Sequence, residues 1–422
     1  MELKRNLLYS IGGQISVFIL AFSFYTLLSR WLGPADFGLY TIVMLVPLLA
    51  GRFGHLGVDA ANAYFIDSGK YQASDIFGNS LVLTVVVFLL ASCGVFVFYL
   101  LDGNSHWRGH SALLAAIAPI AGLSAYRTLF QSTLVGQDRL RAFSFIAIVD
   151  SLFPLFGIVC LFGLNFLSVT SAVIVNFLSL VITCLVLYRI SRFSGALQFN
   201  YQLAKKSVNY GWKSWVNNLA NQALYKVDVF IIGFMLDLSS VGIYTVGVLI
   251  IEKCWYLSGA IGNAIYPKLK NMDIYKGSDL AALAAKSNLY ITSFGAIVIS
   301  IFSVWIIKML FGDDYYGSAL VIVLLAPGII FLAVPKILVS HLAAKDKLEF
   351  AVQASLTALI VNLVANVLFI PFAGIYGAAI ASSLAYLVYL VIYLWNYIKL
   401  TKLSIADIFI FKSTDIKSAF MK

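Results

Sequence analysis

The stretch Leu32-Gly-Pro-Ala-Asp-Phe-Gly38-Leu-Tyr40-Thr41-Ile-Val separates two long apolar runs. A similar stretch, Leu236-Asp-Leu-Ser-Ser-Val-Gly242-Ile-Tyr244-Thr245-Val-Gly, separates two more apolar runs 204 residues later. Leucine, glycine, tyrosine and threonine hold the same places in both. The flanking runs are long enough to cross a bilayer, which takes about 20 apolar residues. The pair therefore predicts a duplicated fold that spans a membrane.

The composition also indicates a membrane protein. Of the 422 residues, 61% are hydrophobic and 11% are charged, and the mean hydropathy is +0.92. Soluble domains carry about 25% charged residues. The four cysteines lie in apolar segments without Cys-x-x-Cys spacing, so we expect them to pack as small core residues.

Twelve apolar segments are long enough to be membrane helices, and we expect an all-α integral membrane fold with six helices in each half. The expected spans are 7–31, 39–65, 77–101, 111–134, 143–165, 168–188, 209–236, 241–267, 287–309, 318–342, 350–371 and 375–398. The expected domains are an N-terminal six-helix lobe at 1–200, a C-terminal six-helix lobe at 201–400 and a cytoplasmic tail at 401–422.

The basic residues predict the orientation of these spans. Of the 29 lysines and arginines, 20 lie on the same side as the N-terminus, 3 lie on the other side and 6 lie within spans. Cytoplasmic loops carry the excess of lysine and arginine. We therefore expect both termini in the cytoplasm. The net charge of +10 then needs no nucleic-acid partner.

Two further matches support the duplication. Gly136-Gln-Asp138-Arg-Leu resembles Ala344-Lys-Asp346-Lys-Leu, and Pro119 matches Pro327, both at an offset of 208 residues. Six helices in each half would give the two halves the same orientation in the membrane. Transporters built from such parallel repeats place the substrate between two lobes that rock against each other.

Six cations lie within the apolar spans, where each costs roughly 2.5–3.5 kcal/mol. They are Arg52, Arg127, Lys213, Lys226, Lys253 and Lys336. Four acids accompany them, namely Asp59, Asp150, Asp228 and Glu252, which leaves an excess of about two positive charges. This excess predicts a wet, cationic cavity that passes an anion. Lys213 is close enough to a span end to extend to the surface.

The second span places Arg52 and Asp59 on one face, so they are expected either to pair with each other or to face the cavity. In the seventh span Asn218, Gln222 and Tyr225 share a face. Amides and aromatic rings, including Trp255 in the eighth span, suit sugar hydroxyls and ring faces. Interhelical hydrogen bonding would use the same amides, and the pattern leaves both alternatives open.

No enzyme motif, phosphate-binding loop or metal-ligand cluster occurs, so we expect neither catalytic residues nor a cofactor nor a metal. The acids Asp59, Asp150, Asp228 and Glu252 are candidate ion carriers for a coupled transporter, with H⁺ and Na⁺ both open.

The short loops, the opening Trp31-Leu-Gly-Pro-Ala-Asp-Phe-Gly38-Leu-Tyr40 and the later Phe311-Gly-Asp-Asp-Tyr315 resemble the Wzx-type flippases. These are polysaccharide-biosynthesis members of the multidrug/oligosaccharidyl-lipid/polysaccharide exporter superfamily, whose fold is MATE-like. The resemblance implies ion-coupled translocation of an undecaprenyl-pyrophosphate-linked oligosaccharide, such as an O-antigen or capsule unit. The movement would run from the cytoplasmic to the periplasmic leaflet of a bacterial inner membrane. It also implies that cavity cations hold the pyrophosphate, here Arg52, Arg127, Lys226, Lys253 and Lys336.

The expected partners are the lipid-linked glycan and the bilayer, with the glycan polymerase machinery as a candidate; the expected state is a monomer. Two other functions stay open. A multidrug or cation antiporter of the same fold would need a cavity dominated by acids. A membrane-embedded glycan polymerase or acyltransferase would typically need a larger outer loop.

Overall fold

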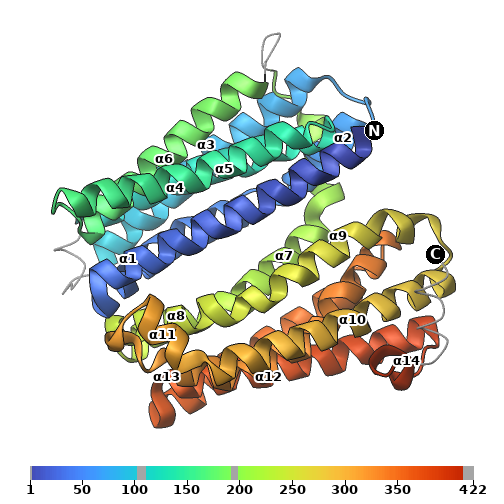
Figure 1. Cartoon of the computed structure of the whole chain (residues 1–422). Coiled ribbons are helices and arrows are strands. Elements are labelled where there is room, and N and C mark those ends of the chain that lie inside the picture. Colours follow the sequence, from blue (N-terminus) through green and yellow to red (C-terminus); the bar gives the residue numbers. More distant parts are fainter. Residues whose placement is uncertain (1, 102–110, 192–197, 412–422) are drawn as a thin grey trace. The chain divides into compact units, whose positions relative to one another are not determined.

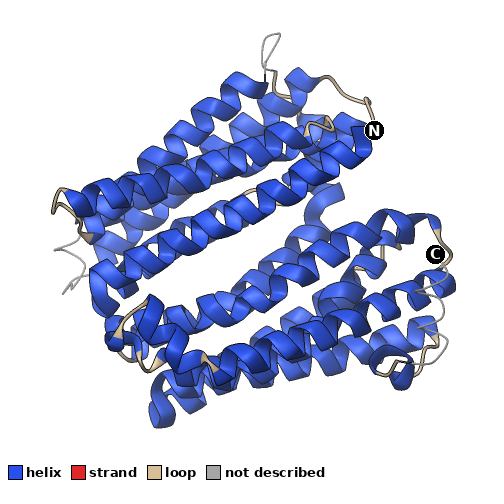
Figure 2. Ribbon diagram, in the orientation of Figure 1, coloured by secondary structure: helices blue, strands red, loops and turns tan. Residues whose placement is uncertain are grey.

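The computed structural model describes residues 2–101, 111–191 and 198–411. Within these ranges every regular element is a helix and none is a strand, so the all-α prediction is confirmed (Figure 2). The chain divides into two compact units, Met1–Trp215 and Val216–Lys422. Arg108 and Arg192, used for the orientation, and the end of the expected tail, 412–422, lie outside the described residues.

The first unit is a bundle in which α1 lies along α4 and α5, while α4 also packs on α2, α3 and α6 (Figure 1). Its helices are α1 (Glu2–Gly54), α2 (Val58–Asp67), α3 (Ala73–Leu101), α4 (Ser111–Gly136), α5 (Leu140–Gly163), α6 (Val169–Ser191) and the first part of α7 (Tyr201–Met235). A non-helical glycine, Gly33 (φ 79°), divides α1 into two segments.

The second unit is built around α12, which contacts α8, α9, α10 and α13 (Figure 1). Besides the rest of α7 it contains α8 (Leu238–Ile251), η2 (Glu252–Trp255), α9 (Tyr256–Asn271), α10 (Ile274–Ile301), α11 (Ser303–Leu310), η3 (Asp313–Tyr315), α12 (Ser318–Ala344), α13 (Glu349–Thr401) and α14 (Ile405–Phe409). Gly374 (φ 56°) divides α13 as Gly33 divides α1.

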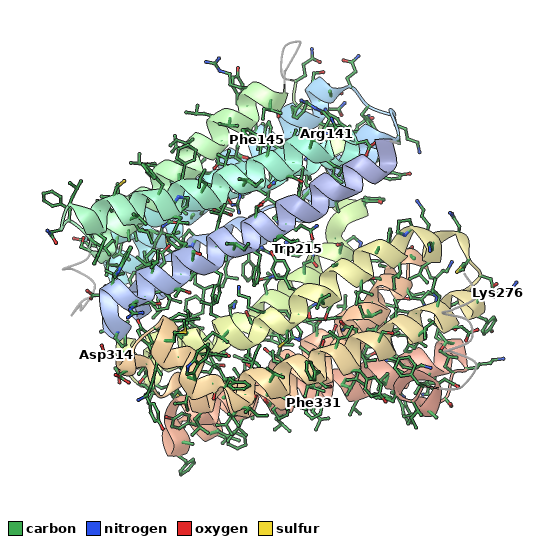
Figure 3. The ribbon with its side chains drawn as sticks, in the orientation of Figure 1. Arg141, Phe145, Trp215, Lys276, Asp314 and Phe331 are labelled. Carbon is green, nitrogen blue, oxygen red and sulfur yellow. The ribbon has the colours of Figure 1, made fainter. Side chains whose placement is uncertain are left out.

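The described helices include nine candidate membrane spans. This number counts α1 and α13 once each, although each has 53 residues and a glycine break, and it omits the more polar α7. If α1 and α13 are each divided at their glycine and α7 is included, the number of spans is consistent with the twelve that were expected. Many large apolar side chains are exposed along these helices, and Figure 3 draws the side chains as sticks with carbon in green, which suits contact with lipid.

The duplication is visible in the backbone of each unit. Asp138 and Asp346 both have φ 53°, and each lies shortly after its helix, α4 or α12. Asn165 (φ 58°) before α6 and Gly374 (φ 56°) inside α13 also both have positive φ. Non-glycine residues rarely have positive φ. The recurrence of positive φ at offsets of 208 and 209 residues therefore supports the predicted repeat.

Buried amides join the same three helices in each unit. The hydrogen bonds run from Asn62 Nδ2 to Ser80 Oγ (2.9 Å) and Leu129 O (3.2 Å) in the first unit, and from Asn288 Nδ2 to Ser258 Oγ (2.9 Å) and Ala333 O (2.8 Å) in the second. The amide and the hydroxyl have exchanged helices between the units, but the carbonyl acceptor belongs to α4 or α12 in both.

The segments 189–208 and 268–286, which the span prediction leaves outside the membrane, contain helix among their described residues. In 268–286, α9 continues to Asn271 and α10 begins at Ile274. The carboxylate of Asp273 caps α10 by accepting from Lys276 N (3.0 Å) and Tyr275 N (2.9 Å). These hydrogen bonds hold the pKa of Asp273 below its usual value. Likewise α7 begins at Tyr201, inside the segment 189–208.

Candidate substrate-binding site

The second membrane helix is broken in both units, and charged residues gather at both breaks. In the first unit the chain leaves α1 after Gly54 and enters α2 at Val58, with Leu56 and Gly57 at positive φ. In the second unit the 3₁₀ turn η2 separates α8 from α9. Broken membrane helices commonly build substrate and ion sites, because they free backbone groups and reorient side chains.

In the first unit, Trp215 satisfies the backbone at the break. Its Nε1 donates to Arg52 O (3.1 Å) and Phe53 O (3.2 Å), which are carbonyls at the end of α1. Gly57 and Gly211 meet backbone to backbone: a Cβ on Gly57 would lie 2.4 Å from Gly211 O. Trp215, labelled on α7 in Figure 3, thus has a structural role here.

Arg127 forms an ion pair with Asp150 of α5, and each side chain is 26% exposed. Asp59 lies 3.3 Å from His55 Nδ1, whereas Arg52 belongs to no ion pair among the described residues. The alternative in which Arg52 and Asp59 satisfy each other is therefore wrong. Arg52 still interacts electrostatically with Arg127 and Asp59, so both arginines belong to one cluster.

In the second unit the lysines of three elements gather around η2. Lys226 Nζ of α7 lies 3.3 Å from Glu252 Oε2. Lys336 of α12 lies with its Nζ 4.1 Å from the ring centroid of Trp255 and 4.9 Å from that of Tyr225. Its Nζ also donates to Tyr225 Oη (3.4 Å). Lys253 interacts electrostatically with Glu252 and Lys226.

Aromatic rings hold Lys336 in place. Tyr225, Trp255 and Tyr386 lie with their ring centroids 5.3–5.9 Å apart, and Trp255 Nε1 donates to Ile329 O (3.0 Å). The ring faces attract the ammonium group through their quadrupoles. Tyr386 was not among the predicted site residues. It belongs to a row of tyrosines on α13, of which Tyr389 and Tyr393 stack on each other, and this row was the available signal.

The predicted excess of positive charge is divided equally, because each unit contains three of the six embedded cations and two of the four embedded acids. Arg52 and Arg127 are accompanied by two carboxylates, Asp59 and Asp150, in the first unit. Around η2, Lys226, Lys253 and Lys336 all interact with the carboxylate of Glu252, and Lys226 also interacts electrostatically with Asp228. Among the described residues, no ion pair includes Lys336.

The remaining predicted acid, Asp228, accepts its hydrogen bonds from residues outside the lysine cluster of Lys226, Lys253 and Lys336. It is 1% exposed and accepts from Tyr244 Oη, from Ser382 Oγ (3.1 Å) and from Val229 N (2.9 Å). Sequence analysis did not select Ser382 or connect Tyr244 to Asp228. The repeated Gly-x-Tyr-Thr stretch contained Tyr244, but only the fold brings it to α7.

The predicted amides of α7 differ in their environment. Asn218 is exposed and Gln222 is half-buried, on the helical face that also carries Tyr225. Asn221 donates to Asn217 O (2.8 Å) within its own helix. Lys213 is half-buried and belongs to the first unit.

Comparison with known proteins identifies the family. The sequence profile described as "Polysaccharide biosynthesis protein" matches residues 3–272. The chain belongs to this family. A Shigella flexneri protein assigned as an O-antigen transporter is 22% identical over 420 residues, covering 95% of this chain and 99% of that protein. A Haloferax volcanii protein assigned as the low-salt glycan biosynthesis flippase Agl15 is 25% identical over 400 residues, covering 92% of this chain and 82% of that protein.

Solved structures confirm the fold of this family member. The lipid II flippase MurJ in an inward closed conformation superimposes with a TM-score of 0.78 at 14% identity, covering 94% of this chain and 90% of that chain. An inward-facing MATE family multidrug transporter gives a TM-score of 0.70 at 14% identity, covering 94% and 98%. The predicted MATE-like membrane fold is therefore confirmed.

Proposed function

We propose that this protein is a flippase that translocates an undecaprenyl-pyrophosphate-linked oligosaccharide from the cytoplasmic to the periplasmic leaflet. Family membership and the flippases among the similar proteins support this function over catalysis. The observation that carries the proposal for this chain is Lys336, which is held on aromatic rings without an ion-pair partner in the described part of the chain.

The lysine cluster suits a diphosphate. Charge-assisted hydrogen bonds from ammonium groups to phosphate oxygens are stronger than neutral ones. Lys336 belongs to no ion pair among the described residues, so a polyanion arriving there would give its ammonium group an anionic partner. We assign Arg52 and Arg127 of the first unit to the same substrate as a second cationic cluster, in which Asp150 competes for Arg127.

The sugars would use the polar face of α7 and the aromatic rings. Asn218 and Gln222 offer amides next to Tyr225, and Trp255 offers a ring face. We further propose that an ion gradient drives alternating access, with Asp59, Asp150, Asp228 and Glu252 as the candidate carriers. The protein would act as a monomer in the bacterial inner membrane, with both termini cytoplasmic, and would supply the glycan polymerase machinery.

Neutralisation of Lys336 tests the proposal. We expect Lys336→Gln to reduce surface glycan in cells by at least tenfold and to leave lipid-linked glycan in the cytoplasmic leaflet. Lys336→Arg should retain most display because it keeps the charge. Lys308→Gln is the matched control, since Lys308 pairs with Asp313 in an exposed segment between α10 and α12.

Membrane abundance of each variant is measured beside surface glycan. Full display by Lys336→Gln at wild-type abundance would refute the role of this lysine. Efflux of cationic drugs that depends on the chain, with normal glycan in its absence, would favour the multidrug antiporter instead.

A further inference from the structure

A cluster of tyrosines and lysines lies in the first unit, where α2 ends and α7 begins. It contains Tyr64 near the end of α2, Lys70 and Tyr71 after that helix, and Lys206 and Tyr210 on α7. We propose that this tyrosine–lysine cluster is a binding site for the phosphate headgroup of an anionic phospholipid. The inference goes beyond glycan translocation, because the ligand is a lipid of the surrounding bilayer and not the transported glycan.

Aromatic rings join α2 to α7 in this cluster. Tyr64 stacks on Tyr210 with the ring centroids 4.6 Å apart. The ring centroid of Phe65 lies 5.1 Å from that of Tyr71 and 5.9 Å from that of Tyr210. Phe65 is buried in a small hydrophobic core, whereas Tyr64 and Tyr210 are 39% and 50% exposed. The fold therefore anchors the cluster from below and leaves aromatic surface accessible.

Two ammonium groups are held against these rings. Lys70 Nζ lies 5.8 Å from the ring centroid of Tyr64, and Lys206 Nζ lies 5.6 Å from that of Tyr71. Lys206 Nζ also donates to Tyr71 Oη (2.9 Å). Because this hydroxyl accepts from the lysine, its own hydrogen can point to an external acceptor. Both lysines are exposed, so the cluster offers two ammonium groups and one hydroxyl to an anion.

In the described part of the chain, no carboxylate forms an ion pair with either lysine. The carboxylates nearest in sequence are Asp67, at the end of α2, and Asp75, in the first turn of α3. Asp75 Oδ2 accepts from Asn200 Nδ2 (3.0 Å) instead. The two lysines therefore complement the charge of a negatively charged ligand.

The cluster lies at helix ends, where lipid headgroups meet a membrane protein. Lys70 and Tyr71 connect α2 to α3, whose apolar span begins at Ala73, and Lys206 is in the second turn of α7. Tyrosine rings are enriched at the level of the headgroups, and lysine stems extend along apolar surface to place the ammonium group there. Basic pockets between membrane helices on the cytoplasmic side bind anionic headgroups. The proposed topology makes this end of the first unit cytoplasmic.

The fixed position of Lys206 distinguishes a site from a diffuse basic surface. Lys205 and Lys206 are adjacent and both exposed, but neighbours on a helix point about 100° apart. Lys206 contacts Tyr71, whereas Lys205 has no ring contact or hydrogen bond among the described residues. General attraction to an anionic membrane would use both lysines equally. A bound phosphate would use Lys206, because charge-assisted hydrogen bonds need a donor in a defined place.

Native mass spectrometry of the purified full-length protein tests the site, with phosphatidylglycerol added to a neutral detergent. We expect one phosphatidylglycerol to be retained at concentrations at which phosphatidylcholine is not. Lys70→Gln and Lys206→Gln should each weaken retention about fivefold, as expected for the loss of one lysine at an anionic surface. Lys206→Arg should retain the lipid because it keeps the charge.

Lys205→Gln is the matched control, because it removes the same charge from the same turn of α7. It should retain phosphatidylglycerol as the wild type does. The unfolding temperature of each variant without lipid checks folding, and it should not change, since these three lysines are exposed.

Equal weakening by Lys205→Gln and Lys206→Gln would show diffuse attraction and overturn the site, and so would equal retention of phosphatidylcholine. Displacement of the lipid by an equal concentration of inorganic phosphate would show that the lipid is not the ligand. Stronger retention of undecaprenyl pyrophosphate than of phosphatidylglycerol would assign the cluster to the transported substrate instead. Glycan display by Lys336→Gln decides the proposed function separately, because Lys336 belongs to the second unit.

Discussion

The ammonium group of Lys336 lies 4.1 Å from the ring centroid of Trp255, a residue of the turn that interrupts the second membrane helix of its unit. The turn thus connects the break in the helix to the position of a buried cation. Trp255 is itself fixed by its hydrogen bond to Ile329 O on α12, the helix that carries Lys336. Any movement of η2 relative to α12 would therefore change the environment of this lysine.

Replacement of Trp255 should weaken the hold on Lys336. Both Trp255→Phe and Trp255→Leu remove the hydrogen bond to Ile329, but only the phenylalanine keeps a ring face under the ammonium group. A cation–π contact is worth about 0.5–2 kcal/mol, so the leucine variant should lose about fivefold more activity than the phenylalanine variant. Surface glycan at matched protein abundance measures the difference; equal loss in both variants would show that the ring face is unimportant.

A second prediction concerns the contribution of the ion pair between Arg127 and Asp150 to stability. Arg127→Gln leaves a partly buried carboxylate without its partner, and Asp150→Asn leaves the guanidinium without its partner. Each single variant should lower the thermal unfolding temperature, and the double variant should recover much of it, with a coupling free energy of about 0.5–3 kcal/mol.

Surface glycan display, measured in the same variants, distinguishes a loss of transport from a loss of stability. The double variant should remain defective in display, because it lacks the positive charge that we assign to the substrate. Recovery of both stability and display in the double variant would mean that Arg127 serves only its ion pair.

The helical fold could be predicted from the sequence because the membrane leaves the backbone few alternatives. An apolar run of about 20 residues must satisfy its own backbone groups, and a helix does so locally. The breaks before Val58 and at η2 were not predictable in the same way. The break before Val58 depends on the close backbone approach of Gly57 to Gly211, residues that are far apart in sequence.

The members of the lysine cluster were predictable, but their arrangement was not. A charge in an apolar run is visible in one sequence, and so Lys226 and Lys336 were selected. That Lys226 would pair with Glu252 while Lys336 would lie on Trp255 depends on how α7, α8 and α12 pack.

The proposed orientation predicts which ends of the second unit can be labelled from outside the cell. Lys276 and Asp314 are both exposed, and Figure 3 labels them at opposite ends of this unit. In a variant without the four native cysteines, Asp314→Cys should react with a membrane-impermeant maleimide in intact cells. Lys276→Cys should react only after permeabilisation. The reverse pattern would invert the topology and contradict export to the periplasmic leaflet.

The contact between Gly57 and Gly211 should be intolerant of any side chain. A Cβ on Gly211 would lie 2.0 Å from Gly57 O, and Gly57 itself has φ 77°, which disfavours other residues. Gly211→Ala should therefore destabilise the first unit by about 1–3 kcal/mol, as overpacking does. Gly94→Ala is the control, because a Cβ on this α3 glycine meets nothing within 4 Å. Thermal unfolding of the purified proteins compares them, and an equal unfolding temperature for both variants would show that this backbone contact does not hold the helix break in place.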